Sequence, residues 1–325
     1  MTPSRVDRCV QTGSGVIYEL PQSQHHLVAP LFEDVWIDKA LIDSVVEGTQ
    51  PARVFVDDPL QPETVLMCCQ RGGYLIMGDS TQGPVRQLIK DMPSEAEVFN
   101  RERFAFFMPQ IAWGDVLTED FGGEIPIFPT RSFRYSEPSI EPVERWRERG
   151  IRDDARVRRI DSDMLAKIDQ GALKAGKAFT VRGQEGVEVT GDELAEIARD
   201  SLGFSTIVGD EIASVASVFG LSSKYASLSI DTTMHFRRQG LATLACVALI
   251  QDCLARGLTP LWNCLASNEA SARTALKLGM EEGPPQRESQ WHPAWKDDVR
   301  PSSGLWKRDE RVTDAQPSVV VWRRI

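Results

Sequence analysis

Hydrophobic and polar residues alternate most regularly in the second half of the chain. Three runs are typical of strands: Phe204–Val208, Glu211–Leu221 and Ala226–Thr232, the last of which alternates apolar and polar residues. Only Gly209-Asp210 separates the first two, and so short a join favours antiparallel neighbours. The next run, Leu241–Ala255, is apolar on almost every side, which predicts a helix buried against a sheet.

The first half of the chain has a less regular pattern. Strands are expected over Arg53–Asp57 and Thr64–Gln70, and the second forms a hairpin with Tyr74–Gly78. Four prolines between residues 126 and 142 predict irregular chain there. We therefore expect a smaller α/β domain over residues 1–140.

A charged segment separates the two halves. Residues 141–163 contain seven arginines and seven acidic residues, a balance typical of a solvated connector. We place this connector at residues 141–156 and the second domain at residues 157–325. Four of the eight tryptophans lie in the tail over residues 291–325, so we expect the tail to be folded back.

Composition narrows the class of protein. The 325 residues are 42% hydrophobic and 26% charged, which is ordinary for a globular chain of two domains. The net charge of −10 argues against a nucleic-acid partner and is compatible with a cationic substrate such as an amine. Long apolar runs, a signal-peptide core and C-x-x-C pairs are absent from the sequence. We therefore expect a cytoplasmic protein with reduced thiols, no membrane span and no metal.

The chemically most informative stretch, Met234–Thr243, joins the third strand to the buried helix. Backbone N–H groups at a helix start have no partner within the helix, and the helix dipole adds positive charge there. Arg237 and Arg238 add full charges, and Gly240 lets the backbone approach an anion without a Cβ atom in the way. This combination predicts a seat for a phosphate or pyrophosphate. A surface turn with two solvated arginines is the plain alternative.

The order of strands, turn and helices is similar to that of the GNAT acyltransferase superfamily. Its phosphate-binding signature, Arg/Gln-x-x-Gly-x-Gly/Ala, matches Arg237-Arg-Gln-Gly-Leu-Ala242. The other segments that carry the resemblance are Ile230-Asp-Thr232, Leu261-Trp-Asn-Cys264, Asn268-Glu-Ala-Ser271 and Leu278-Gly-Met280. The Trp-x-Cys and Asn-x-x-Ser spacing resembles the antibiotic self-resistance branch that includes zwittermicin acetyltransferase. The match is clear over residues 200–282.

The resemblance implies a fold and an acyl donor. The fold is of the α/β (α+β) class, a mixed, mostly antiparallel GNAT-like sheet with flanking helices. The smaller domain before it is interpreted as a degenerate half of the same fold. The co-substrate is acetyl-CoA or another acyl-CoA, with its pantetheine on the strand, its pyrophosphate at the turn and its arm beside the following helix. The implied cofactor-binding residues are Ser229, Ile230, Asp231, Thr232, Arg237, Arg238, Gln239, Gly240, Leu241, Ala242, Thr243, Asn268 and Ser271. Asn268 and Ser271 also suit plain helix capping.

The residues at the usual catalytic positions differ from those common in the family. Many GNAT enzymes use a Glu on the strand ahead of the turn and a Tyr seven residues after the motif Asn. Here the strand carries Ser227 and Ser229, and the Tyr position is Ala275. The catalytic candidates are His235, Tyr225 and Cys264, with Asp231 and Glu211 as further substitutes. Deprotonation of the amine through water, without a single essential base, stays open.

The sequence thus predicts an acetyl-CoA-dependent N-acetyltransferase that acts on a primary amine of a small molecule. The branch resemblance suggests an antibiotic or another secondary metabolite. One alternative is a protein or peptide amine as acceptor. Another is a regulatory module that binds acyl-CoA with little catalysis, motivated by the missing Glu and Tyr. We expect no nucleic-acid or membrane partner and allow for a homodimer.

Overall fold

The chain folds into two compact units. The computed structural model describes residues 8–12, 15–69, 73–81, 83–90, 104–120, 127–149, 151–152, 154–174, 202–291, 306–308 and 322–324. Unit 1 comprises residues 1–132, 263–268 and 283–325, and unit 2 comprises residues 133–262 and 269–282. Most of the aromatic tail lies outside the described residues, apart from the short paired strands β15 (Trp306–Arg308) and β16 (Trp322–Arg324).

Unit 1 is built on a largely antiparallel sheet. Its strands lie in the order β1 (Arg8–Thr12), β2 (Gly15–Leu20), β3 (Ala52–Val56), β4 (Thr64–Cys69), β5 (Gly73–Gly78), β6 (Phe104–Met108), β14 (Gln286–Trp291) and β7 (Ile127–Arg134). The β5–β6 pair is parallel, whereas the other neighbours pair antiparallel. The predicted strands near residues 53–57 and 64–70, and the hairpin of the second with residues 74–78, are therefore confirmed.

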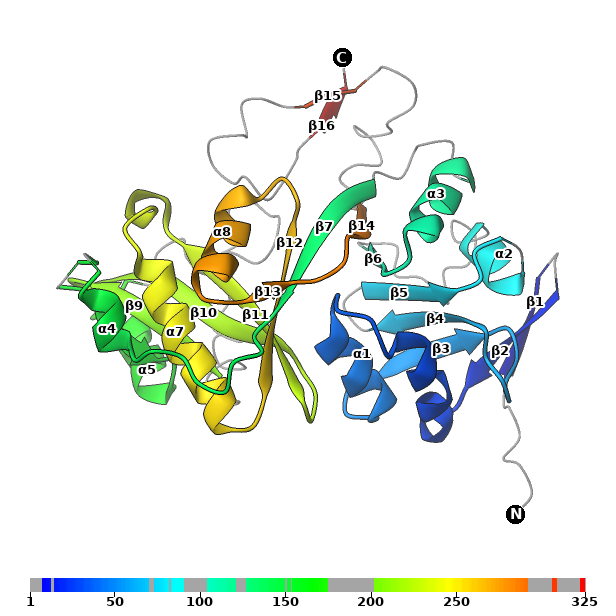
Figure 1. Cartoon of the computed structure of the whole chain (residues 1–325), viewed down its shortest axis with the longest axis horizontal. Coiled ribbons are helices and arrows are strands. Elements are labelled where there is room, and N and C mark those ends of the chain that lie inside the picture. Colours follow the sequence, from blue (N-terminus) through cyan, green and yellow to red (C-terminus); the bar gives the residue numbers. More distant parts are fainter. Residues whose placement is uncertain are drawn as a thin grey trace. The chain divides into compact units, whose positions relative to one another are not determined.

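Helices cover both faces of the unit 1 sheet (Figure 1). On one face lie the 3-10 helix η1 (Gln22–Phe32) and α1 (Lys39–Val46), and on the other lie α2 (Pro84–Lys90) and α3 (Ile111–Asp120). Every residue of β4 is buried, because its alternate side chains enter two separate cores. Met67 packs in the core beneath η1 and α1, and Leu66 packs in the core beneath α2 and α3.

Pro129 lies inside strand β7, so the prediction of irregular chain between residues 126 and 142 was wrong over residues 127–134. Proline has no N–H to donate to a sheet, but its carbonyl can still accept. The Pro129 carbonyl accepts a hydrogen bond from the Ala266 amide at 2.8 Å, and Pro129 pairs in register with Arg287 of β14. These two neighbours hold an extended segment that local sequence alone disfavours.

The strands of unit 2 also pair in mixed directions. Its strands lie in the order β12 (Thr259–Leu265), β11 (Tyr225–Thr232), β10 (Glu211–Leu221), β9 (Gly203–Val208) and β8 (Arg156–Arg159). Only β11 and β12 pair parallel, and the other neighbours are antiparallel. The remaining elements of this unit include α4 (Val143–Arg147) and the short strand β13 (Glu281–Glu282). The predicted mixed, mostly antiparallel sheet is confirmed.

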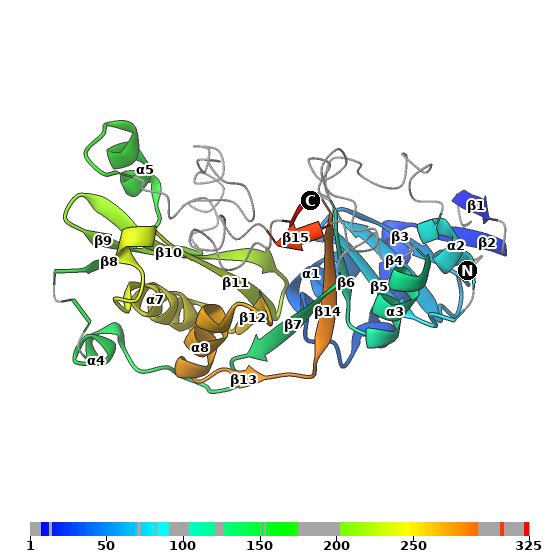
Figure 2. The same cartoon turned by 90° about the horizontal axis from the view of Figure 1, so that it is seen from above.

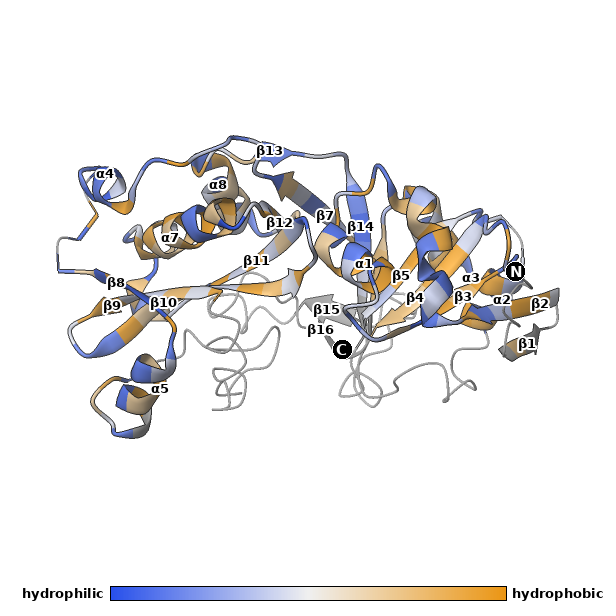
Figure 3. Ribbon diagram, turned by 90° about the horizontal axis from the view of Figure 1, so that it is seen from below, coloured by the Kyte–Doolittle hydropathy of each residue, from blue (hydrophilic) through white to orange (hydrophobic). Residues whose placement is uncertain are grey.

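Helices flank the unit 2 sheet on opposite faces (Figure 2). One face is covered by α7 (Leu241–Ala255) and α8 (Glu269–Lys277), and the other by α5 (Ser162–Asp169). The predicted bounds of α7 are confirmed, and its apolar surface lies against β9, β10 and β11 (Figure 3). All residues from Thr243 to Ile250 are buried. In the described part of the chain no helix is both long and apolar enough to cross a membrane.

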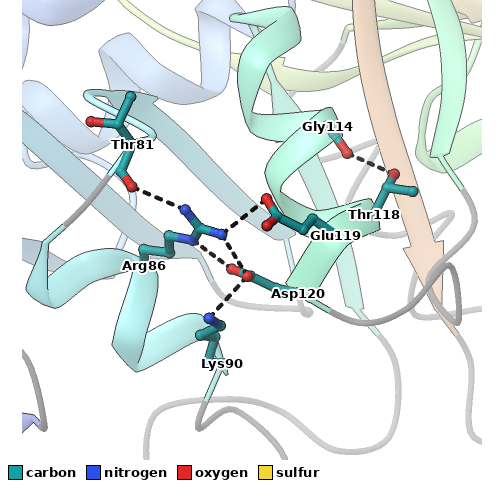
Figure 4. A network of polar contacts seen from close by, with 7 residues as sticks. All are labelled: Thr81, Arg86, Lys90, Gly114, Thr118, Glu119 and Asp120. Atoms are coloured by element: carbon teal, nitrogen blue, oxygen red, sulfur yellow. Dashed lines mark hydrogen bonds and ion pairs between the residues drawn. The ribbon is translucent and has the colours of Figure 1, made fainter.

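A charged network joins α2 to α3 within unit 1 (Figure 4). The Arg86 guanidinium donates two hydrogen bonds to the Asp120 carboxylate, at 2.7 and 2.6 Å. Lys90 Nζ lies 3.0 Å from the same carboxylate, and Arg86 also donates to the Thr81 carbonyl at 3.0 Å. The hydrogen bonds from Arg86 lower the pKa of Asp120, whose side chain is only 4% exposed.

Replacing Asp120→Asn should lower the free energy of unfolding by about 1.5–3 kcal/mol at pH 7, because charge-assisted hydrogen bonds to Arg86 are lost. The folded-state pKa of Asp120 lies below its unfolded value, so its stabilisation is present above the unfolded pKa. It disappears as the pH falls through the folded pKa, and variant and parent should then converge. Urea denaturation across this pH range measures the difference.

Glu119→Gln is the matched control for that variant. Glu119 contacts the same Arg86 at 3.3 Å, but its side chain is 75% exposed. Such a solvated pair contributes little, so we expect a change below about 0.5 kcal/mol. Equal losses in the two variants would contradict the role given to Asp120.

Candidate active site

The candidate site begins where the parallel pairing of β11 with β12 ends. The ladder joins Tyr225–Leu228 to Thr259–Trp262, whereas β11 runs on to Thr232 in register with β10. Burial changes at the same place: Tyr225–Leu228 are buried and Ser229–Thr232 are partly exposed. The last four residues of β11 therefore form an accessible strand segment, to which a ligand with amide groups can add hydrogen bonds.

A turn with an unusual backbone conformation follows this strand. The 3-10 helix η4 (Met234–Phe236) leads into two residues with left-handed backbone, Arg238 at φ 61° and Gly240 at φ 77°. Arg237 Nε donates to the Thr232 carbonyl at 3.1 Å, and Gln239 Nε2 donates to the His235 carbonyl at 2.9 Å. A left-handed arginine is uncommon and costs free energy, so its presence marks a turn whose shape is imposed by its surroundings.

The N-terminus of α7 opens directly from this turn. Gly240 is the N-cap residue and has no side chain that could accept from the first amides, and the first turn contains no acidic residue. The helical hydrogen bonds begin with the Leu244 amide, which donates to the Gly240 carbonyl at 3.3 Å. The amides of Leu241, Ala242 and Thr243 precede this bond. Such amides, together with the positive end of the helix dipole, favour an anion.

Arg152 adds a third guanidinium beside the turn. Its Nη1 donates to Gln239 Oε1 at 3.2 Å, and its Nε and Nη2 bind the Asp154 carboxylate at 2.8 and 2.6 Å. This contact is not evident from sequence, because Arg152 lies 87 residues before Gln239 in a segment dense in arginines. The Asp154 pair fixes the guanidinium plane next to the seat.

The second motif segment lies at the start of α8. Ser271 Oγ accepts a hydrogen bond from Trp262 Nε1 at 2.9 Å, which ties α8 to β12 within unit 2. The Asn268 amide donates to the Leu265 carbonyl at 2.9 Å and thus closes the turn between β12 and the helix. The Trp-x-Cys and Asn-x-x-Ser residues therefore have structural contacts of their own, beside any role in binding a ligand.

The three catalytic candidates lie in different surroundings. The His235 side chain is 59% exposed, and its Nε2 lies 3.4 Å from Glu211 Oε2. Tyr225 is buried at the start of β11, with Arg134 and Lys224 over its ring at 5.5 and 5.1 Å. At about 3.3 Å per residue, Tyr225 lies roughly 13 Å along the strand from Ser229. Cys264 is partly exposed in β12, two residues beyond the end of the ladder.

Comparison with known proteins identifies the family. The family model of the GNAT acetyltransferases matches residues 29–285. The chain belongs to the GNAT acetyltransferase family. It is therefore an acyltransferase, and this GNAT match extends through both units rather than through unit 2 alone.

Relatives and solved structures agree with the GNAT assignment. The uncharacterized N-acetyltransferase YdfB of Bacillus subtilis is 23% identical over 266 residues, 82% of this chain and 95% of that protein. A GCN5-related N-acetyltransferase-like protein of Streptococcus suis matches with a TM-score of 0.57 and 21% identity, covering 83% and 99% of the two chains. A tandem GNAT protein from the clavulanic acid biosynthesis pathway matches with a TM-score of 0.50 and 10% identity, covering 85% and 98%.

Metal-binding side chains do not gather in this GNAT chain: across the described ranges there is no group of three or more His, Cys, Asp or Glu. The polar groups around the turn are instead cationic side chains and backbone amides, a donor set that suits an anionic ligand.

Gly240 fits its position for a reason that the sequence did not reveal. A Cβ atom at Gly240 would lie 2.8 Å from Ile151 Cγ1, in addition to the strain of the left-handed backbone. Gly240→Ala should therefore lower the melting temperature more than Gly209→Ala. Gly209 has φ 61° and no atom within 4 Å of its added Cβ, so it carries the backbone strain alone.

We expect the difference between these two variants to be about 1–3 kcal/mol, the usual cost of overpacking. Ile151→Ala in the Gly240→Ala background should recover part of it. Equal destabilisation of the Gly240 and Gly209 variants in thermal unfolding would contradict the contact with Ile151.

Proposed function

We propose that the protein is an acetyl-CoA-dependent N-acetyltransferase for a primary amine of a small molecule. One observation carries this proposal: β11 extends beyond its ladder with β12 and ends in a cationic turn at an uncapped helix start. Acyl-CoA has a matching sequence of groups, since two amides of the pantetheine arm lead to a pyrophosphate. Each part thus has a complementary partner on the chain.

The residues of the proposed acyl-CoA site follow the end of β11, the turn after it and the start of α7. Ser229–Thr232 would bind the pantetheine amides through their backbone, and Arg237–Thr243 would hold the pyrophosphate through amides and guanidinium groups. Asn268 and Ser271 would contact the cofactor arm near the start of α8. We add Arg152 to this set, because its contact with Gln239 keeps its positive charge beside the turn.

Acetyl transfer requires a neutral amine, a leaving thiolate and a group that receives the amine proton. His235 is assigned to the anion seat rather than to proton transfer, because it is mostly exposed and precedes Arg237 by two residues. Tyr225 is buried with Arg134 and Lys224 over its ring, so we assign it a role in packing. Cys264 would need a nearby base to act as a nucleophile. None of the three supplies an obvious proton acceptor.

The acceptor is proposed to be a small metabolite, with a role in antibiotic resistance or secondary metabolism. Support comes from the motif spacing and from the clavulanic acid pathway named for one tandem GNAT structure. A net charge of −10 favours attraction of a cationic amine. We further propose a cytoplasmic location, since all six cysteines are free thiols.

Two alternative functions would use the same acyl-CoA site. A protein or peptide amine is a second class of acceptor, because fold alone does not determine the substrate. A regulatory module that binds acyl-CoA with little turnover is the other, since Ala275 and the serines of β11 replace the usual Tyr and Glu.

A thiol-release assay separates these functions. Acetyl-CoA is incubated with the full chain and panels of amino sugars, polyamines, amino acids and peptides. We expect thiol release that depends on one class of small primary amine, with mass-spectrometric detection of the acetylated product. Release only with peptides would favour the second acceptor class. Tight acetyl-CoA binding without release for any amine would favour the regulatory module.

Arg238→Asn tests the donor seat directly. Asparagine tolerates left-handed backbone, so the variant removes one cation without changing the turn. We expect CoA binding by isothermal titration calorimetry to weaken about tenfold, or about 1.4 kcal/mol, at an unchanged melting temperature. Arg158→Gln on β8 is the control, because it removes the same charge from a surface of unit 2 outside the turn.

Arg238→Asn should have normal activity with an acetyl donor that lacks the pyrophosphate. The acetyl thioester of N-acetylcysteamine has no pyrophosphate, so kcat/KM with this donor should be equal for the parent and Arg238→Asn. Equal losses with both donors, or unchanged CoA affinity, would contradict the assignment of the turn to the pyrophosphate.

A further inference from the structure

Asp38 begins helix α1 of unit 1 in an unusual way. An aspartate at this N-cap position ordinarily accepts a hydrogen bond from an amide of the first turn, but the Asp38 side chain accepts none. Its backbone is left-handed, at φ 45°, and the residue is only 1% exposed. Burial of a carboxylate and a strained backbone both cost free energy, so the contacts around Asp38 must hold it in this position.

The Asp38 carboxylate binds a distant side chain instead. Asn263 Nδ2 donates a hydrogen bond to Asp38 Oδ1 at 3.2 Å, and both residues belong to unit 1 although 225 positions separate them. Trp36 helps to hold this segment, because a Cβ atom added to Gly283 would lie only 2.5 Å from its ring. A carboxylate can only accept, so the donor end of the Asn263 amide must face Asp38.

The carbonyl end of the Asn263 amide is the part that the protein leaves unused. Asn263 as a whole is partly exposed, whereas its Oδ1 atom is buried and has no hydrogen-bond partner among the described residues. A buried acceptor without a donor is unfavourable, so this oxygen needs a reason beyond packing. A ligand that reaches the exposed part of the side chain could supply the missing donor.

Asn263 also lies next to the proposed path of the acyl-CoA. Trp262 and Leu228 form the last rung of the β11–β12 ladder, and Asn263 is the next residue of β12. An acyl-CoA with its pyrophosphate at the start of α7 and its pantetheine arm along Ser229–Thr232 brings its thioester to this rung. Trp262 Nε1 donates to Ser271 of α8, so alternation along the strand directs Asn263 to the face of the sheet opposite α8.

We propose that Asn263 binds the amino group of the acceptor and that Asp38 is its positioning residue. Asn263 Oδ1 accepts a hydrogen bond from an N–H of the incoming amine, beside the thioester. Asp38 holds the other end of the amide, so that the oxygen rather than the NH₂ group is presented to the amine. Amine binding by Asn263 rests on the proposed acetyl transfer, to which it adds a residue that recognises the acceptor.

Asn263→Leu in the full chain tests this binding, because leucine has a similar size and no polar atom. The probe is whichever of glucosamine, spermidine and lysine gives the fastest release of thiol from acetyl-CoA. We expect the KM for this amine to rise about tenfold or more, the scale of one hydrogen bond to a charged group. The Kd for acetyl-CoA should stay within about twofold of the parent, and kcat within about threefold.

Two substitutions of Asp38 separate positioning from plain stability. Asparagine tolerates left-handed backbone and keeps an oxygen that accepts from Asn263, so Asp38→Asn should retain the KM for the amine within about threefold. Asp38→Ala removes that oxygen, and its KM should rise about as much as in Asn263→Leu. Because Asp38 acts through Asn263, the double variant Asp38→Ala/Asn263→Leu should have a KM within about threefold of the higher single value.

Ser44→Ala is the matched control. Ser44 is also 1% exposed, lies in the helix that Asp38 begins, and donates to the Leu41 carbonyl at 2.7 Å. The variant therefore loses a buried hydrogen bond of α1 and keeps the contact between Asp38 and Asn263. We expect a lower melting temperature, with the KM for the amine within about twofold of the parent.

Different results overturn different claims. A parent chain that releases no thiol in response to any of the three amines overturns the proposed function, and amine binding by Asn263 with it. An active parent whose amine KM is unchanged in Asn263→Leu overturns the role of Asn263 alone, as do equal rises in the amine KM and the acetyl-CoA Kd. An unchanged KM in Asp38→Ala overturns the positioning role. If Asn263→Leu fails to fold, Asn263→Ser, whose hydroxyl can still donate to Asp38, replaces it with the same expected rise.

Discussion

The way in which β11 ends is the constraint on which the proposed acyl-CoA site depends. The strand leaves its parallel partner after Leu228, continues for four residues beside β10, and enters a turn with two left-handed residues. The turn leads into the N-terminus of α7, which no side chain caps. Backbone amides, rather than side chains, are then the main donors, and they are fixed before any ligand binds.

The regular part of unit 2 follows from local sequence. Strand-like runs bounded by tight turns and a helix that is apolar on almost every side have few alternatives, so β9, β10, β11 and α7 match their predicted ranges closely. The turn at the start of α7 was predictable for the same reason, since its glycine, two arginines and helix start are contiguous in the sequence. Pro129 in β7 was not, because neighbours distant in sequence hold it extended.

The rest of the site depends on contacts between distant segments. Ile151 explains why position 240 must be glycine, and Arg152 reaches Gln239 across 87 residues, yet both lie in a segment that read as a solvated connector.

The central claim is that an acyl-CoA lies along the end of β11 with its pyrophosphate at the start of α7. Hydrogen–deuterium exchange of the full chain with and without CoA tests it most directly, because amides that bind the ligand exchange more slowly. We expect CoA to slow exchange in peptides that cover residues 229–232 and 239–243, and to leave β3–β5 of unit 1 unchanged. Slower exchange elsewhere, with these two segments unaffected, would contradict the claim.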